Sequence, residues 1–196
     1  MTRRGSYAKG LAKREEILTT ALELVARNGY RRTTVRELAD AVGLSQAGLM
    51  HHFGSKEELF TEILRRRDEA DRAEFLGDPE TTDLPDAYVR LVRHNAGVPG
   101  LVRLYNRVSA EAVEPEHPSH GYFSERYRAL RADTAEAIRR LQAEGRMPAA
   151  ADPDKLAVLV TAVLDGLQTA WLHDPGTDMA EHVAHFWELV GGVRPE

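Results

Sequence analysis

Residues 34–53 read TVRELADAVGLSQAGLMHHF, and this stretch predicts two short helices joined by a tight turn. Thr34 can cap the first helix, and Glu37 three residues later completes a capping box. Gly43 stands where a helix ends in a left-handed conformation, which glycine adopts without steric cost. Ser45 can cap the second helix. The local signals therefore predict a helix-turn-helix in the first third of the chain.

The apolar positions of this stretch support the same interpretation. Four of them are spaced to fill a small core between the two helices, and Ala39 is small enough for the helices to cross closely; the four are Leu38, Val42, Leu44 and Leu49. An ordinary helical hairpin is the alternative, since short capped helices with a glycine turn are common. The agreement of the caps, the glycine and the apolar spacing favours a DNA-binding motif.

The rest of the chain has helical periodicity and no alternating strand pattern, which predicts an all-α fold. Turn residues separate the periodic segments. With the motif, nine helices or so are expected, over about residues 11–28, 34–42, 46–52, 55–75, 84–95, 100–113, 120–144, 154–173 and 178–190.

Charge is unevenly distributed along the 196 residues. The formal net charge is −5, but residues 1–60 carry +3 and residues 61–196 carry −8. Five cations and no acid occur in the first 14 residues. A basic N-terminal part on an acidic body fits a small DNA-reading head on a separate domain, although a solvated charged tail would look the same.

Several classes of protein are excluded by composition. The chain has no cysteine, which excludes disulfides, thiolate zinc sites and cysteine nucleophiles. No apolar stretch follows the basic N-terminus, so this segment is not expected to be a secretory signal. The longest apolar run, Leu156–Leu164, is about half of the roughly 20 residues that a membrane helix needs. We therefore expect a cytoplasmic protein with no membrane partner.

From Arg14 to about Leu64 the chain resembles the TetR family of regulators, most densely in TTVRELADAVGLS and GLMHHFGSKEELF. The later stretches HPSHGYFSERYRALR, ADPDKLAVL and LDGLQTAWLHDP resemble ligand-binding domains of one subgroup of that family. The resemblance implies nine or ten helices, a homodimer, a palindromic operator in double-stranded DNA and release of the DNA when a small-molecule inducer binds.

The resemblance also implies which residues touch DNA. Arg36, Gln46 and Ala47 match positions that contact base edges in family members, while Thr34 and Lys56 match phosphate contacts. Arginine can fork onto guanine and glutamine can pair with adenine in the major groove. Two departures concern the second motif helix, where Met50 replaces a usual tyrosine and Gly48 a common threonine. The expected DNA-contacting residues are therefore Thr34, Arg36, Gln46, Ala47, Gly48, His51, His52 and Lys56.

Three functional segments are expected: a flexible basic arm over residues 1–10, a helix-turn-helix domain over residues 11–53, and a ligand-binding and dimerisation domain over residues 54–196. Isolated polar groups on apolar helices predict an inducer cavity lined by Tyr88, His94, Tyr105, Asn106, Ser109, Asp165 and Gln168. Asp165 favours a neutral or cationic ligand. Asp165 and Gln168 could instead lie on a solvent or dimer-edge stripe.

The last two helices are expected to form the dimer interface. Their most exposed-looking apolar residues are Leu164, Leu167, Trp171, Val183, Phe186 and Trp187. Packed two by two, these helices would make a four-helix interface with the same patch on both subunits.

No catalytic motif, cofactor motif or paired-histidine zinc helix stands out. His182, His185 and Glu188 have a spacing compatible with metal ligation, but they flank an apolar stripe, so no metal is expected. Two rivals to a ligand-responsive repressor remain: a DNA-binding regulator without an inducer, acting as an activator or constitutive repressor, and, more remotely, a helical enzyme.

Overall fold

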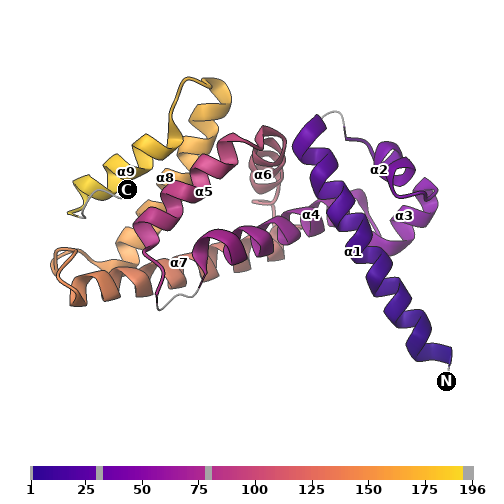
Figure 1. Ribbon diagram of the computed structural model, residues 1–196, viewed down its shortest axis with the longest axis horizontal. Coiled ribbons are helices and arrows are strands. Elements are labelled where there is room, and N and C mark those ends of the chain that lie inside the picture. The colour runs from indigo at the N-terminus through magenta and orange to yellow at the C-terminus, as the bar shows by residue number, and fades with distance from the viewer. Residues whose placement is uncertain (1, 30–32, 78–80, 192–196) are drawn as a thin grey trace. The chain divides into compact units, whose positions relative to one another are not determined.

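A computed structural model of the chain describes residues 2–29, 33–77 and 81–191, and all regular structure within them is helical (Figure 1). This confirms the predicted all-α fold of about nine helices. The elements are α1 (Thr2–Asn28), α2 (Val35–Ala41), α3 (Gln46–Phe53), α4 (Lys56–Asp71), the π-helical turn η1 (Arg72–Leu76), α5 (Leu84–Ala96), α6 (Pro99–Glu111), α7 (His120–Ala143), α8 (Pro153–His173) and α9 (Met179–Leu189).

The chain forms two compact units. The first comprises the chain up to Glu69 together with Val98–Ser119, and the second comprises Ala70–Gly97 and the chain from His120 onward. α6 therefore belongs to the unit that contains the helix-turn-helix, because it packs on α1. The sequence suggested a boundary after residue 53, between a helix-turn-helix domain and a ligand-binding domain. The two structural units do not divide the chain there, and the expected functional segments stay predictions.

α1 begins at Thr2, nine residues before the expected start at Leu11. The backbone of residues 2–10 is helical, and the role of residues 1–10 as a flexible basic arm stays a prediction. No proline interrupts the segment, and the helix continues through Gly10. The side chains of Arg3 and Arg4 lie outside the described residues, so their contact with DNA stays a prediction.

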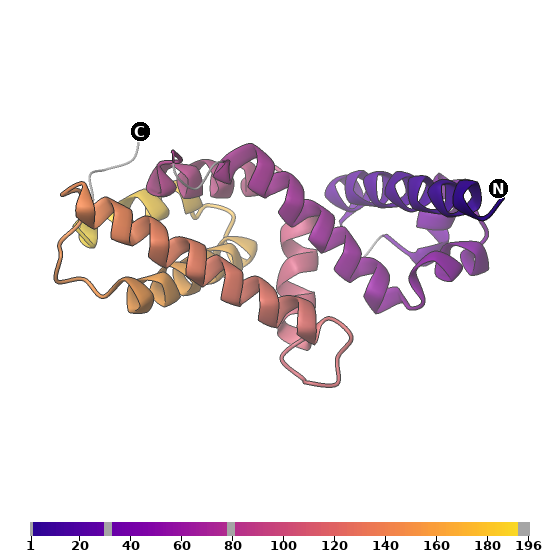
Figure 2. The ribbon, with the colours of Figure 1, turned by 90° about the horizontal axis from the view of Figure 1, so that it is seen from below.

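In the first unit, α1 supplies the apolar face on which the other helices pack. Ile17, Ala21 and Val25 of α1 are fully buried. α6 approaches the C-terminal end of α1 at Gly100, where the two ribbons run close together in both views (Figures 1 and 2). A Cβ atom at Gly100 would collide with the carbonyl oxygen of Val25 and would lie 2.9 Å from the Cα of Gly29. This backbone-to-backbone contact therefore requires glycine.

In the second unit, α7 packs along α8 and α5 packs along α9. The core between these helices contains Tyr88, Ile138 and Trp187, each at most 1% exposed. α8 is long and apolar enough by composition to cross a membrane. It packs against α7 and α9, and Leu156, Val160 and Leu164 are buried there.

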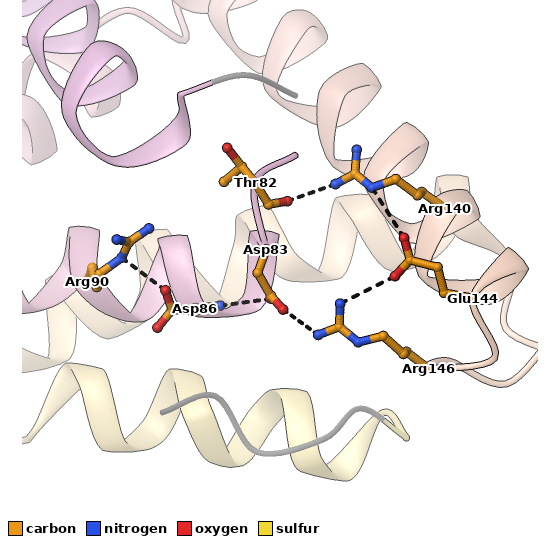
Figure 3. Close-up of polar contacts among 7 residues, drawn as sticks. All are labelled: Thr82, Asp83, Asp86, Arg90, Arg140, Glu144 and Arg146. Atoms are coloured by element: carbon orange, nitrogen blue, oxygen red, sulfur yellow. Dashed lines mark hydrogen bonds and ion pairs between the residues drawn. The ribbon is translucent and has the colours of Figure 1, made fainter. Parts of the chain in front are cut away.

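An ion-pair network anchors the start of α5 in the second unit (Figure 3). Asp83 caps α5 and accepts a hydrogen bond from Arg146, in the turn between α7 and α8. This hydrogen bond from Arg146 to Asp83 raises the pKa of the Arg146 guanidinium above its ordinary value. Arg140 donates to the carbonyl oxygen of Thr82 at 2.8 Å. The N-terminus of α5 is thus tied to the end of α7.

Replacing Gly100 with alanine should lower the free energy of unfolding by about 1–3 kcal/mol, because α6 must move away from the backbone of α1. Urea unfolding followed by circular dichroism measures the change. Gly121→Ala is the matched control, since a Cβ there meets nothing within 4 Å and alanine is the better helix former. Equal stability of the two variants would contradict the tight contact.

Candidate functional site

The predicted caps of the helix-turn-helix are all present. The Thr34 side chain accepts a hydrogen bond from the Glu37 backbone N–H at 3.1 Å, and the Glu37 carboxylate accepts one from the Thr34 backbone N–H at 2.8 Å. Gly43 has a φ of 67°, in the left-handed region. Ser45 accepts from the Gly48 N–H at 3.0 Å and so caps α3. The caps and the turn predicted from the sequence are therefore confirmed.

α1 holds both motif helices near their C-terminal ends. The Lys13 ammonium donates to the carbonyl oxygen of Val42, just after α2, at 3.0 Å. The Arg14 guanidinium lies 4.6 Å from the centre of the Phe53 ring, at the end of α3, and pairs with Glu62 of α4 at 3.1 Å. The orientation of α3 is thus set by contacts with its neighbours as well as by its own turn.

The predicted DNA-contacting residues lie mainly on the outside of this motif. Gln46, Ala47 and His51 of α3 are exposed, as are Thr34, Arg36 and Lys56; Gly48 and His52 are half-buried. Arg36 is 3.9 Å from Asp40 on the same helix, and the Thr34 hydroxyl donates to Glu37 at 3.1 Å. The structure therefore presents amide, guanidinium, imidazole and ammonium donors from three consecutive helices of one unit.

The seven predicted inducer-contacting residues are divided between the two units. Tyr105, Asn106 and Ser109 lie on α6, in the first unit, whereas Tyr88, His94, Asp165 and Gln168 lie in the second. Asn106 donates to the carbonyl oxygen of Val102, and Ser109 to that of Asn106, so both side chains bond to their own helix. Tyr105 is buried.

Tyr88 is a core residue whose hydroxyl is satisfied inside the protein. Its ring is stacked on that of Trp187, with centres 6.5 Å apart. Its hydroxyl is 2.7 Å from the Thr134 hydroxyl, which itself donates to the carbonyl oxygen of Leu130, so Tyr88 is the donor of the pair. Burial raises the pKa of the Tyr88 phenol from 10.0 to about 12. His94, by contrast, is exposed beside the ring of Phe75.

Asp165 and Gln168 are polar residues of α8 whose side-chain oxygens differ in their hydrogen bonding. Asp165 is half-buried and accepts a 2.7 Å hydrogen bond from Tyr127 of α7. Tyr127 is not among the inducer residues expected from the sequence, so this pairing was missed. Gln168 is buried, and its Nε2 donates to the carbonyl oxygen of Leu164. Its Oε1 has no hydrogen-bond partner among the described residues, and neither does Nε1 of Trp187.

A separate surface cavity of about 540 Å³ lies within the second unit, between α5, α9 and the turn at residues 174–178. The buried side chains of Val92 and Met179 and the half-buried Trp171 line it, together with charged residues, Arg93, Asp178 and Glu181. None of the seven predicted inducer residues lines it. This cavity was not expected from the sequence, because the turn between α8 and α9 carries no motif.

The expected exposure of the dimer residues is wrong for three of the six. Leu164, Val183 and Trp187 point into the core of the second unit, with Trp187 fully buried, while Leu167, Trp171 and Phe186 are half-buried. α8 has apolar residues on both faces, so periodicity alone did not distinguish inside from outside. The exposed large apolar residues of α8 and α9 are Val158, Leu159 and Leu189, at 46%, 55% and 71%.

Within the described parts of the chain, no three His, Asp or Glu side chains gather closely enough to hold a metal ion. His182 lies 2.7 Å from the carbonyl oxygen of Asp178 through Nδ1, and His185 lies 3.1 Å from a Glu188 oxygen. Both contacts are local to α9.

Comparison with known proteins finds two matching family descriptions. Residues 17–63 match bacterial regulatory proteins of the tetR family, and residues 119–188 match the C-terminal domain of BetI-type transcriptional repressors. The HTH-type transcriptional repressor AcnR of Corynebacterium diphtheriae is 31% identical over 173 residues, covering 87% of each chain.

Other relatives are similar over different lengths. The repressor KstR2 of Rhodococcus jostii is 51% identical over 53 residues, so this match spans only 26% of that protein and 27% of this chain. A transcriptional regulator from Saccharomonospora viridis, solved in complex with choline, is 30% identical with a TM-score of 0.69. That likeness covers 89% of this chain and 95% of the other.

The raised pKa of Tyr88 predicts a loss of stability in alkali. Between pH 10 and 12 the unfolded chain releases this phenolic proton and the folded chain retains it, so the stability present below pH 10 falls by on the order of 2 kcal/mol. Tyr88→Phe should remove this part of the pH dependence, measured by urea unfolding at a series of pH values. Tyr122→Phe, at a half-buried phenol, is the control, and the same alkaline slope in the Tyr88 variant would contradict the assignment.

Proposed function

Because the chain belongs to the TetR family of transcriptional regulators, we propose that it is a homodimeric DNA-binding repressor that a small molecule releases from a palindromic operator. The observation that carries the proposal is the capped helix-turn-helix, which exposes polar donors on α3 and on the helices before and after it. A role on DNA implies that the protein acts in the cytoplasm.

In this proposal α3 enters the major groove, as the second helix of such a motif does. Gln46 and Ala47, in its first turn, face base edges, and Arg36 of α2 reaches a guanine. Lys56 neutralises a phosphate beside the N-terminus of α4, where backbone N–H groups also favour an anion. Base contacts give sequence preference, whereas the phosphate contacts give affinity and salt dependence.

A dimer is needed because one helix-turn-helix reads only a short half-site. The exposed apolar side chains of Val158, Leu159 and Leu189 support an interface built from α8 and α9. Ala162 and Gly166, also exposed on α8, are small enough to let a partner helix approach closely. The proposed interface uses the two helices expected from the sequence. It is formed by their exposed side chains, because Leu164, Val183 and Trp187 point into the core.

The inducer is proposed to be a small organic cation bound in the second unit. Support comes from the half-buried carboxylate of Asp165, oriented by Tyr127, and from the acceptor oxygen of Gln168 that has no partner within the described chain. Carboxylates and aromatic faces are the groups that bind quaternary ammonium ions. The choline complex of the Saccharomonospora viridis regulator supports the same chemical class.

Release follows if the inducer and the operator prefer different conformations of the dimer. Two recognition helices must sit in successive major grooves, roughly 34–36 Å apart. A ligand that binds better to a dimer with another spacing shifts the population away from the DNA-binding form.

The DNA proposal predicts different effects for two variants. Gln46→Ala should relax preference at one base pair in each half-site, at a cost of about 1–3 kcal/mol. Lys56→Ala should weaken binding to all sequences alike and flatten the salt dependence. Binding measured by fluorescence anisotropy on operator and single-base variants separates the two effects. An unchanged base preference in Gln46→Ala would contradict the proposed docking of α3.

The dimer proposal predicts that Leu159→Asp gives a folded monomer with much weaker operator binding, because a buried charge disrupts the apolar contact. Sedimentation velocity measures the oligomeric state. Val113→Asp, at another exposed apolar residue but in the loop after α6, is the matched control and should stay dimeric. Trp187→Asp would unfold the protomer instead, since that ring lies in the core. A dimeric Leu159→Asp would move the interface elsewhere.

The inducer proposal predicts that choline, used as a probe cation, raises the melting temperature and weakens operator binding. The operator must weaken choline binding by the same factor. Asp165→Asn should reduce the affinity for choline far more than that for an uncharged analogue of equal size, measured by calorimetry. Inducers that are all anionic, or a bound cation that leaves operator affinity unchanged, would contradict it.

A further inference from the structure

The last turn of α3 offers few groups that can bind a phosphate. Met50 has a thioether, which is only a weak hydrogen-bond acceptor and cannot donate to an anion. Phe53 is buried. His51 and His52 are thus the two side chains of this turn that can donate a hydrogen bond to DNA. An imidazole differs from the other donors of the motif because its charge changes between pH 5 and 8.

Both imidazoles are placed for contact outside the protein. His51 is exposed, and His52 is half-buried with its ring 6.4 Å from that of Phe53. The two ring centres are 6.2 Å apart. Neither ring has a hydrogen-bond or ion-pair partner among the described residues. Their nitrogens therefore remain available to an incoming ligand.

The two rings lie among charged groups of both signs. The C-terminal position on α3 favours a cation through the helix dipole. The charged groups on the neighbouring elements are mixed in sign: Arg36, Glu37 and Asp40 on α2, Lys13, Arg14 and Glu16 on α1, and Lys56, Glu57 and Glu58 at the start of α4. Two imidazolium ions at 6.2 Å would also repel each other. An anion beside them removes that penalty.

We infer that His51 and His52 bind operator phosphates as imidazolium ions, so that DNA binding by this protein takes up protons. The inference rests on the proposed DNA-binding function and adds a regulation of the same site. Imidazole in water is mostly neutral above about pH 7.5, whereas an imidazole beside a phosphate retains its proton. The proton comes from the solvent, and no covalent bond changes.

The direction of the pH effect follows from this uptake. Operator affinity rises as the pH falls, by about tenfold per pH unit for each proton taken up, until the free protein is itself protonated. Two rings in each of two subunits give a limit of about four protons per dimer. Lysine and arginine contacts stay charged throughout this range and contribute no such slope.

The test uses the full-length protein and a duplex of about 30 base pairs that it selects from a random-sequence pool, long enough for two half-sites. Isothermal titration calorimetry at pH 7.5 in buffers of different ionisation enthalpy counts the protons taken up. We expect net uptake by the unmodified protein and a Kd that weakens as the pH is raised from 6 to 8. Because this count needs no mutation, it does not depend on how any variant folds.

Variants assign the protons to the two rings. His51→Gln and His52→Gln should each lower the uptake, and the double variant should abolish it. Lys56→Ala should weaken binding with the uptake unchanged, because its contact is not proton-linked. His173→Gln, at an exposed histidine at the end of α8, controls for histidines elsewhere.

Operator binding without proton uptake, or with the same uptake in the double variant, would overturn this inference and leave the proposed function standing. Failure to select any DNA sequence at pH 6, 7 and 8 would overturn both.

Discussion

The orientation of α3 depends on a small apolar contact between two short helices and α1. Leu38, Ala39 and Leu49 are at most 1% exposed, and Gly43 provides the left-handed residue that lets the chain reverse between them. Helices of seven and eight residues have little stability of their own. Their geometry is therefore maintained by the contacts that α1 makes at Val42 and Phe53. The exposed donors of α3 are positioned only as well as this core is packed.

The buried polar groups of the second unit differ in whether they have a hydrogen-bond partner inside the protein. The hydroxyls of Tyr88 and Thr134 form a closed chain that ends on a backbone carbonyl, so that part of the core is complete without a ligand. The oxygen of Gln168 has no such partner within the described residues. An unsatisfied buried polar atom costs about 1–3 kcal/mol, and a bound molecule or water that pairs with it recovers this energy. The proposed inducer can therefore pair with the oxygen of Gln168, close to the half-buried Asp165 on the same helix, whereas the hydroxyl of Tyr88 already has its partner.

The parts of the structure that followed from the sequence are those set by local rules. The caps at Thr34 and Ser45 and the turn at Gly43 need only neighbouring residues, and each was predicted from its residue type. Which side chains of α8 are buried and which are exposed could not be predicted in this way. Leu159 and Leu164 are both leucines on one long apolar helix, yet one is exposed and the other buried. Their difference depends on how α8 packs against α7 and α9, through residues that are not near neighbours in sequence. The pairing of Tyr127 with Asp165, 38 positions apart, is one such contact.

Net charge is a poor guide to the electrostatics of this DNA-binding head. Residues 1–60 carry a formal +3, but several cations are close to carboxylates: Lys13 with Glu16, Arg14 with Glu62 and Arg36 with Asp40. At the exposed pairs the interaction is weak, because solvent screens it and the arginine or lysine can exchange its partner for a phosphate. The exchange still leaves a carboxylate near the DNA. One head therefore provides little net attraction, which favours the proposed arrangement of two heads on one operator, each aided by backbone N–H groups at helix N-termini. Electrostatics and the short half-site thus support the proposed dimer independently.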